Sequence, residues 1–442
     1  TLVSYVLTKV AVTVYAGGLV FQQVFGIKEL WGIDFFWIAA IGLVVLTALY
    51  TIFGGMKSVL YTSVLQTPIL LLGSLIILVL GFKELGGWDE MMRVCGAVTV
   101  NNYGDTMTNL IRSNDDANFP WLGALIGSAI IGFWYWCTDQ FIVQRVLSGK
   151  NEMEARRGTI FGAYLKLLPV FLFLIPGMIA FALHQKYIGA GGEGFLPMLA
   201  NGTANADAAF PTLVAKLLPA GVKGLVVCGI LAALMSSLAS LFNSSAMLFT
   251  IDFYKRFRPE TPEKKLVGIG QVATVVIVIL GILWIPIMRS VGDVLYTYLQ
   301  DVQSVLAPGI AAAFLLGICW KRTSAQGGMW GLIAGMVIGL TRLGAKVYYS
   351  NAGEVADSTF KYLFYDMNWL FFCGWMFLFC IIVVIVVSLA TKAPTAEKIQ
   401  GLVFGTATKE QKAATRASWN HWDIIHTVII LAITGAFYWY FW

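Results

Sequence analysis

Apolar runs of about twenty residues recur along the whole chain, and they constrain its fold more than any other feature. A helix of that length crosses a hydrocarbon core of about 30 Å. Helices are the expected form because lipid offers no hydrogen-bond partners to bare backbone groups. Only 12% of the 442 residues are charged, about half the share that is usual in a soluble domain. The sequence therefore predicts an all-α polytopic membrane protein.

The hydropathy pattern predicts eleven membrane spans. Their expected bounds are 1–25, 33–53, 58–82, 118–147, 157–184, 222–250, 265–289, 293–318, 325–347, 369–391 and 422–441.

Charges in the connecting stretches predict the orientation of these spans. Stretches rich in Lys and Arg alternate strictly with stretches that are poorer in net positive charge, as the positive-inside rule requires. The basic ones are 145–157, 255–265, 319–322 and 392–416, and the others are 83–117, 185–221 and 348–368. We expect residue 1 to be cytoplasmic and the C-terminus external. The net charge of +6 then belongs to cytoplasmic loops, and no compact basic domain indicates nucleic-acid binding.

Polar groups at membrane depth are costly, so each points to function or to buried pairing. The segment 134–140 (WYWCTDQ) sets aromatic rings beside Asp139. Such rings suit a sugar platform, because pyranose rings present apolar C–H faces; an interfacial aromatic belt is the alternative. Lys166 offers three donors in mid-span, or it extends its ammonium group to the cytoplasmic face.

Two further segments carry uncharged polar groups inside spans. Ser236 and Ser237, with more hydroxyls up to position 245, can coordinate a hard cation such as sodium; the residues alone favour small-residue helix packing. Gln300 and Asp301 precede Pro308-Gly309, which predicts a broken helix whose free carbonyls line a site. A re-entry loop at the interface is the alternative.

Three more cations lie near the ends of spans. Lys9, Arg342 and Lys346 are expected to be anchors or ion-pair partners rather than substrate ligands. The chain shows no Ser/His/Asp trio, no P-loop and no paired carboxylates near a Lys or His, so we do not expect an enzyme. Its six cysteines show neither a disulfide framework nor a zinc spacing.

Read together, these segments resemble the sodium/glucose cotransporter family of the sodium:solute symporter superfamily. The resemblance runs over nearly the whole chain. The stretches that carry it are Thr8-Lys9, TALYTIFGG at 47–55, LQTPILLLGS at 65–74, WYWCTDQFIVQRVLS at 134–148, YLKLLPVF at 164–171, FPTLVAKLLPAGVKGL at 210–225, LAALMSSLASLFNSSAMLFTIDFY at 231–254, LGICWKR at 316–322 and WGLIAGMVIGLTR at 330–342.

This resemblance implies a LeuT-like transporter core of two inverted five-helix repeats within fourteen spans. The eleven predicted spans match the family's last eleven, so we expect the first three spans to be missing, with the broken first core helix that supplies part of both sites. The chain is then a single transmembrane transporter domain, 1–442. It comprises the end of the first repeat (1–82), the second repeat (118–318) and peripheral C-terminal helices (325–442).

The resemblance also implies sodium-coupled symport of a monosaccharide such as glucose or galactose by alternating access. Tyr135 is expected to stack on the pyranose ring with Trp136 as its neighbour, and Lys166 and Gln300 to donate hydrogen bonds to sugar hydroxyls. The co-transported sodium ion is expected to bind the Ala233 carbonyl and the hydroxyls of Ser236 and Ser237. We expect a multi-pass protein of the plasma membrane, or of the inner membrane in a bacterial cell, with no obligate protein partner.

Two departures from the family pattern keep the substrate and the stoichiometry open. The family usually has Tyr-Thr-Asp where this chain has Tyr61-Thr62-Ser63; that Asp is linked to a further sodium position, so we expect one sodium per sugar. Thr297 and Gln303 differ from familiar glucose transporters. The same fold carrying myo-inositol, an amino acid or a carboxylate is an alternative, and so is a sugar-gated sodium conductance or sensor.

Overall fold

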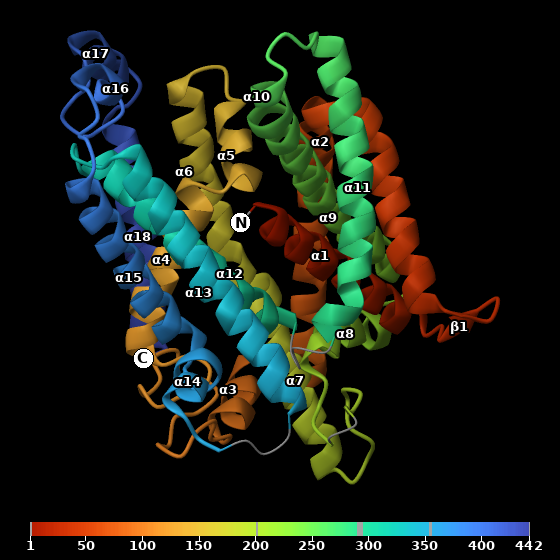
Figure 1. The fold of residues 1–442 in the computed structure, drawn as a ribbon. Coiled ribbons are helices and arrows are strands. Elements are labelled where there is room, and N and C mark those ends of the chain that lie inside the picture. The colour runs from red at the N-terminus through yellow and green to blue at the C-terminus, as the bar shows by residue number, and fades with distance from the viewer. Residues whose placement is uncertain (1, 200–201, 290–294, 353–355, 442) are drawn as a thin grey trace. The chain divides into compact units, whose positions relative to one another are not determined.

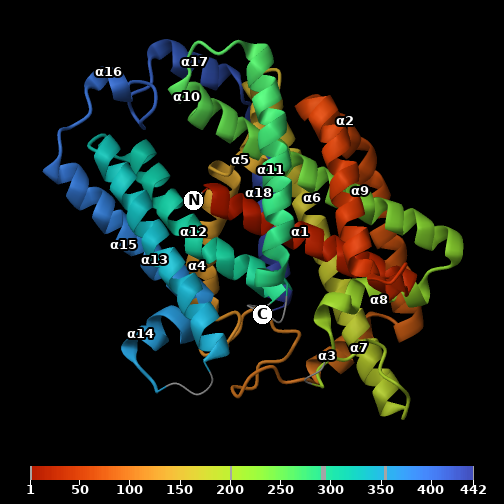
Figure 2. The same ribbon diagram turned by 45° about the vertical axis from the view of Figure 1, so that its right-hand side comes forward.

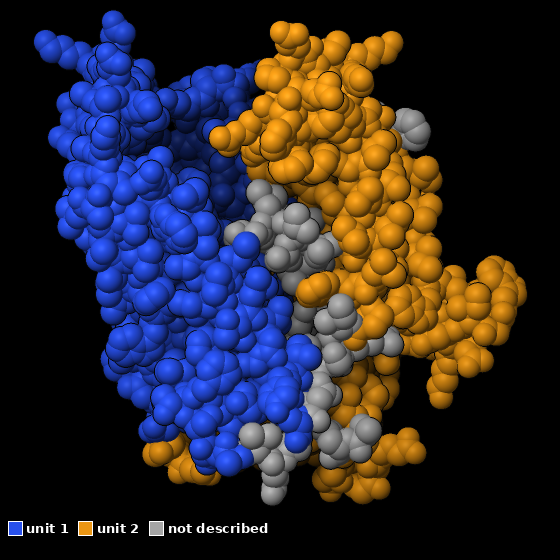
Figure 3. Space-filling model, in the orientation of Figure 1, with its two compact units in different colours: residues 1, 109–164, 296–442 blue, residues 2–108, 165–295 orange. Residues whose placement is uncertain are grey.

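The computed structural model describes residues 2–199, 202–289, 295–352 and 356–441, and most of these are helical (Figure 1). The chain divides into two compact units (Figure 3). Unit 1 comprises Asn109–Tyr164 and Tyr296–Trp442, and unit 2 comprises Leu2–Thr108 and Leu165–Leu295. Helix α6 (Glu152–Pro169) runs from unit 1 into unit 2.

Unit 2 contains most of the N-terminal helices and one strand pair. Its helices are α1 (Leu2–Phe25), α2 (Phe35–Leu85), α3 (Trp88–Gly96), η1 (Val170–Leu174), α7 (Ile175–Gly189), η2 (Ala206–Ala208), α8 (Ala209–Leu217), α9 (Ala220–Met247), η3 (Leu248–Tyr254), α10 (Lys255–Phe257) and α11 (Glu263–Arg289). The strands β1 (Glu29–Leu30) and β2 (Ile33–Asp34) pair antiparallel.

Unit 1 contains the C-terminal helices together with α4 and α5. Its helices are α4 (Trp121–Cys137), α5 (Gln140–Leu147), α12 (Leu295–Cys319), α13 (Ala325–Asn351), α14 (Thr359–Lys361), η4 (Tyr362–Asp366), α15 (Trp369–Ala390), α16 (Ala396–Ile399), α17 (Lys409–Ala417) and α18 (His421–Tyr440). Three of the η segments, η1, η3 and η4, are wide π-helical turns.

Nine helical stretches in the described part of the chain are long and apolar enough to cross a membrane, and the bent pair α4–α5 raises the number to ten. The nine are Phe35–Ile52, Leu60–Leu85, Glu152–Gly189, Ala220–Phe257, Glu263–Pro286, Leu299–Cys319, Ala325–Ser350, Trp369–Ala390 and His421–Tyr440. The predicted all-α polytopic fold is confirmed. Ten of the eleven predicted spans have a counterpart here; the first, 1–25, forms helix α1 but is not among the nine.

Close approach of helix backbones organises unit 2. Helix α2 packs along α9, and α1 packs against α11 and α2. At Gly281 of α11, an added Cβ would lie 2.4 Å from a methyl group of Val10, so only glycine lets α1 come this near. Small residues at such contacts are typical of membrane helices, because packing rather than water exclusion holds them together.

In unit 1, helix α13 also packs closely against its neighbours through glycines. A Cβ on Gly335 would lie 3.0 Å from the Gly309 Cα of α12, and a Cβ on Gly331 would lie 2.3 Å from a methyl group of Val384 of α15. The Arg322 guanidinium, just before α13, donates a 2.7 Å hydrogen bond to the Thr391 carbonyl at the end of α15. Cations stabilise helix C-termini in this way.

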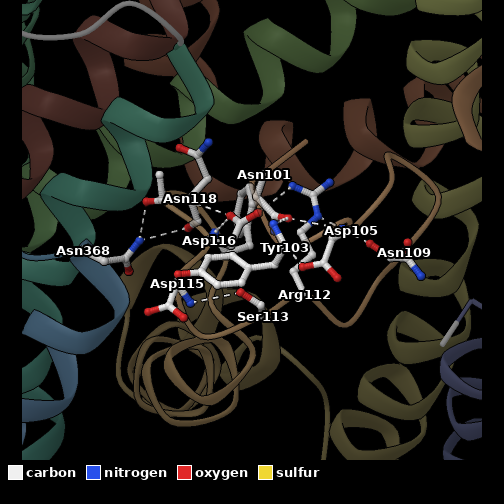
Figure 4. Close-up of polar contacts among 12 residues, drawn as sticks. Asn101, Tyr103, Asp105, Asn109, Arg112, Ser113, Asp115, Asp116, Asn118 and Asn368 are labelled. Carbon is white, nitrogen blue, oxygen red and sulfur yellow. Dashed lines mark hydrogen bonds and ion pairs between the residues drawn. The ribbon is translucent and has the colours of Figure 1, made fainter. Parts of the chain in front are cut away.

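The N-terminus of α15 fixes the loop that leads into α4 (Figure 4). The Asn368 amide donates to the carbonyls of Ala117 at 2.7 Å and Asn118 at 3.3 Å. The amide oxygen of the same side chain accepts the Leu370 N–H at 2.8 Å and so caps α15. Because α4 also packs along α15, this one side chain helps to set the position of the helix that carries Tyr135.

An ion triad joins α12 to α13. The Asp301 carboxylate accepts a 2.6 Å bond from the Lys346 ammonium and lies 3.4 Å from the Arg342 guanidinium. Arg342 is completely buried; it also donates to the Met367 carbonyl at 2.8 Å and lies 4.1 Å from the centre of the Phe372 ring. The prediction that Arg342 and Lys346 are ion-pair partners is confirmed, and Lys9 is buried in α1.

We predict that Asp301→Asn strongly destabilises the protein. The change leaves the Arg342 charge buried without its carboxylate, which typically costs about 3–5 kcal/mol. Thermal unfolding in detergent measures the effect as a lower midpoint. Asp357→Asn is the matched control, because Asp357 pairs with Lys361 at 2.9 Å on an exposed surface and such pairs contribute little. Equal midpoints for the two variants would contradict a stabilising role for the triad.

Candidate functional site

The end of α4 carries three consecutive aromatic residues. Trp134 is buried, Tyr135 is half-buried and Trp136 is 47% exposed. The Tyr135 ring centre lies 6.1 Å from that of Trp134 and 5.4 Å from that of Trp136, which stands edge-on to it. Tyr135 is thus held between two rings, an arrangement that fixes its orientation while part of its surface stays accessible.

The span that contains these rings is broken directly after them. The sequence predicted one span over 118–147, but α4 ends at Cys137 and α5 begins at Gln140, with a bend of 45° between them. The buried Asp139 carboxylate accepts the Phe141 N–H at 3.1 Å and caps α5. A capping carboxylate stabilises a new helix start, so the group that the sequence set beside the aromatic rings also makes the break.

Gln300 is half-buried on α12, next to Asp301 of the ion triad. The predicted break at Pro308-Gly309 is wrong, because α12 continues as one helix from Leu295 to Cys319 with Pro308 inside it. Neighbouring helices allow proline within a membrane helix, and Gly309 packs here directly against Gly335 of α13. Gln303 is buried on the same helix; the side chain at position 297 lies outside the described ones.

Lys166 lies in α6, three residues before Pro169, and its side chain is exposed. After Pro169 the helix widens into the π-helical η1 and then continues as α7, so that a single 38-residue stretch, Glu152–Gly189, is built from three helical segments. Wide turns of this kind often occur at functional sites.

The predicted sodium ligands lie on α9. Ser236 is buried, whereas Ala233 and Ser237 are half-buried. The Ser236 hydroxyl lies 2.6 Å from the hydroxyl of Ser63 on α2, and the Ser240 hydroxyl donates to the Ser236 carbonyl at 2.9 Å. The residue that replaces the family's usual Asp is therefore in direct contact with a predicted sodium ligand.

Tyr50 of α2 makes a further polar contact with this part of α9, and the sequence analysis did not single it out. Its hydroxyl donates to the Met235 carbonyl at 2.8 Å. The sequence contained a signal for this contact, because a tyrosine hydroxyl inside an apolar span needs a hydrogen-bond partner. Tyr50 and Ser63 would lie about 20 Å apart along a straight helix, yet they reach adjacent residues of α9. The two predicted spans 33–53 and 58–82 both lie on the continuous helix α2 (Phe35–Leu85) and are not separated by a loop.

The candidate residues are distributed over both units. Tyr135, Trp136 and Gln300 belong to unit 1, whereas Lys166, Ala233, Ser236 and Ser237 belong to unit 2. Within residues 2–199, 202–289, 295–352 and 356–441, no group of three or more His, Cys, Asp or Glu side chains could hold a metal ion. The oxygens that the α9 strip offers are hydroxyls and carbonyls, which suit a monovalent hard cation.

Comparison with known proteins finds sodium cotransporters among the relatives of this chain. The chain is 35% identical to human sodium/myo-inositol cotransporter 2 over 91% of this chain and 60% of the relative. It is 35% identical to sodium/mannose cotransporter SLC5A10 of Bos taurus over 99% of this chain and 75% of the relative. It is 34% identical to sodium/glucose cotransporter 4 of Danio rerio over 90% of this chain and 61% of the relative. The chain thus spans about 60% of the length of most of these relatives.

The fold is similar to a solved structure of a Na⁺-coupled sialic acid symporter in a substrate-bound, outward-open state. The TM-score is 0.64 at 20% sequence identity, over 88% of this chain and 74% of that one. The family model of sodium:solute symporters matches residues 1–335. On this match, and on the identity to three cotransporters over most of its length, the chain belongs to the sodium:solute symporter family.

Proposed function

We propose that this chain takes part in sodium-coupled symport of a monosaccharide by alternating access, with one sodium ion per sugar. The observation that carries the proposal is the contact between Ser236 and Ser63, which concentrates neutral oxygens on a buried strip between α9 and α2. In the proposed site the Ala233 carbonyl and the hydroxyls of Ser236 and Ser237 bind the sodium ion. Neutral oxygens replace the hydration shell of a hard monovalent cation without trapping it.

The sugar site is proposed at Tyr135, Trp136, Lys166 and Gln300. The Tyr135 ring, held between its two aromatic neighbours, offers a flat surface for the apolar face of a pyranose. Gln300 supplies both a donor and an acceptor to sugar hydroxyls, and the Lys166 ammonium supplies donors. The aromatic surface and the few polar groups match the usual make-up of a small-molecule site.

A neutral polyol is the class of solute that the charges favour. Near Gln300, both cations of α13 are already paired with Asp301. A carboxylate substrate would need a cation beyond Lys166 that is not held by a protein carboxylate. The relatives named for myo-inositol, mannose and glucose agree with a neutral solute.

The sodium gradient supplies the work in this proposal. The membrane potential contributes about 2.3 kcal/mol per charge per 100 mV, which corresponds to roughly fifty-fold accumulation. Coupling requires that sodium bind more tightly to the state that binds sugar than to the state that does not.

The direct test is counterflow of labelled galactose, glucose and myo-inositol in proteoliposomes, with and without sodium. Because this chain spans about 60% of the length of most of the relatives named above, the polypeptide tested extends over their full length. We expect sodium-dependent exchange of at least one of the three solutes. Sugar-induced sodium current without tracer uptake would instead indicate a conductance or sensor. Solute exchange at the same rate with and without sodium would contradict the proposal.

We predict that Ser237→Ala and Gln300→Ala affect different ligands in the same assay. Loss of a hydroxyl ligand to a cation should raise the half-saturating sodium concentration about tenfold while the sugar KM, measured at saturating sodium, changes little. Loss of the Gln300 amide should raise the sugar KM by a similar factor and leave the sodium dependence in place. Each variant is the control for the other. If both transport like wild type, the site assignment is wrong.

We predict that Ser63→Asp changes the sodium stoichiometry. The new carboxylate would lie against Ser236, where a 2.6 Å hydroxyl contact now stands, and a negative charge there favours an additional cation. The expected result is a Hill coefficient for sodium that rises from one towards two, measured by uptake at varied sodium. Ser63→Ala at the same position should keep the coefficient at one. A coefficient near two in the wild type would contradict the expected single sodium.

A further inference from the structure

A basic segment, residues 391–420, joins two membrane spans at one face. Helix α15 ends at Ala390 and α18 begins at His421, and both are spans. Figures 1 and 2 show α16 and α17 of this segment beyond the ends of α15 and α18. The segment is therefore held within reach of the lipid headgroups by its own two ends.

Hydrogen bonds make part of this segment, the 399–406 loop, a rigid structure. The Thr406 hydroxyl donates to the carbonyls of Ile399 at 2.8 Å and Val403 at 2.6 Å. The backbone turns through Gly401, whose φ is +77°, a conformation that favours glycine. The Phe404 N–H donates to the Ile318 carbonyl at 2.8 Å and fastens the loop to the end of α12.

The rigid loop presents two large apolar side chains outward. Leu402 is 73% exposed and Phe404 is 76% exposed, whereas Val403 between them is buried. The loop buries only one of its three consecutive apolar side chains, so the exposure of the other two follows from its fixed conformation. At the face of a membrane, apolar side chains in this position enter the boundary between headgroups and acyl chains.

Positive charge surrounds these two side chains. The segment 391–420 contains the five basic residues Lys392, Lys398, Lys409, Lys412 and Arg416, against the two acidic residues Glu397 and Glu410. Helix α17, which starts with a capping box formed by Thr408 and Gln411, is exposed along its whole length and carries three of the five. Juxtamembrane basic clusters attract anionic lipids.

We propose that the 399–406 loop and α17 form a surface that binds anionic phospholipid of the bilayer. Leu402 and Phe404 insert into the acyl boundary, and Lys398, Lys409 and Lys412 contact the phosphates. Apolar anchors and basic groups act together here, because either one alone gives only weak and reversible membrane contact. The proposal is independent of the transported solute.

The test places a spin label on Leu402→Cys and measures its depth in lipid nanodiscs. The exposed cysteines Cys137, Cys228 and Cys319 are replaced by Ala. The buried ones are retained; burial raises the pKa of the Cys95 thiol to about 11, so it stays unreactive at the labelling pH. Collision rates with oxygen and with a water-soluble nickel chelate report depth. Ala414→Cys, on the exposed face of α17 that points away from Lys409 and Lys412, is the control position.

We expect the label at 402 to lie below the headgroups in nanodiscs that contain phosphatidylglycerol, and the label at 414 to stay in water. Lys409→Gln with Lys412→Gln should make the depth at 402 independent of phosphatidylglycerol and should reduce the number of anionic lipids retained in native mass spectrometry several-fold. Lys361→Gln, on α14 outside the segment, should change neither. A label at 402 that stays in water in every lipid overturns the proposal and points to a protein partner. Equal depth in phosphatidylcholine alone overturns the requirement for anionic lipid.

Discussion

The structure depends on one constraint, namely that polar groups inside a bilayer must find their partners within the protein. Several hydroxyls of the spans meet it locally, by donating to a carbonyl one turn earlier on the same helix. Thr47, Thr51, Ser240, Ser244 and Ser245 all do so, at 2.6–2.9 Å. These side chains therefore add hydroxyl oxygens to the interior without leaving their protons unpaired.

Two kinds of buried polar contact result, and they suit different tasks. The Asp301–Arg342–Lys346 triad is ionic, and breaking it leaves a bare charge in a medium of low dielectric constant. The contact between Ser63 and Ser236 joins two neutral hydroxyls, and such a bond contributes only about 1 kcal/mol net. The ionic contact fixes helices to one another. The contact between two hydroxyls can be replaced by contacts of the same oxygens with a cation at a small cost in free energy.

The sequence indicated the all-α fold and most spans, because these follow from the composition and length of local runs. It also indicated that Arg342 and Lys346 would be anchors or ion-pair partners rather than substrate ligands, and the structure shows the ion pairs. It misplaced the helix breaks. Proline in α12 did not break the helix because α13 packs closely against it, whereas Asp139 did break α4 because its carboxylate caps the next helix.

The local sequence pattern could not predict which residues far apart in the chain form hydrogen bonds with one another. The residues Ser63 and Ser236 are 173 positions apart and Tyr50 and Met235 are 185 apart. Hydropathy identifies each hydroxyl as a group that needs a partner but does not say which one. The sodium and sugar ligands themselves came from the family resemblance rather than from spacing, and they remain predictions for kinetic experiments.

The π-helical turn η1 has a mechanical consequence for the span that contains Lys166. A wide turn holds one more residue than an α-turn. If η1 tightens to α geometry, the part of the span beyond it rotates by about 100° and advances by about 1.5 Å. Pro169 marks the beginning of this joint. The face of α7 can thus be re-aimed relative to Lys166 by a change of pitch at five residues, while both flanking helices stay intact.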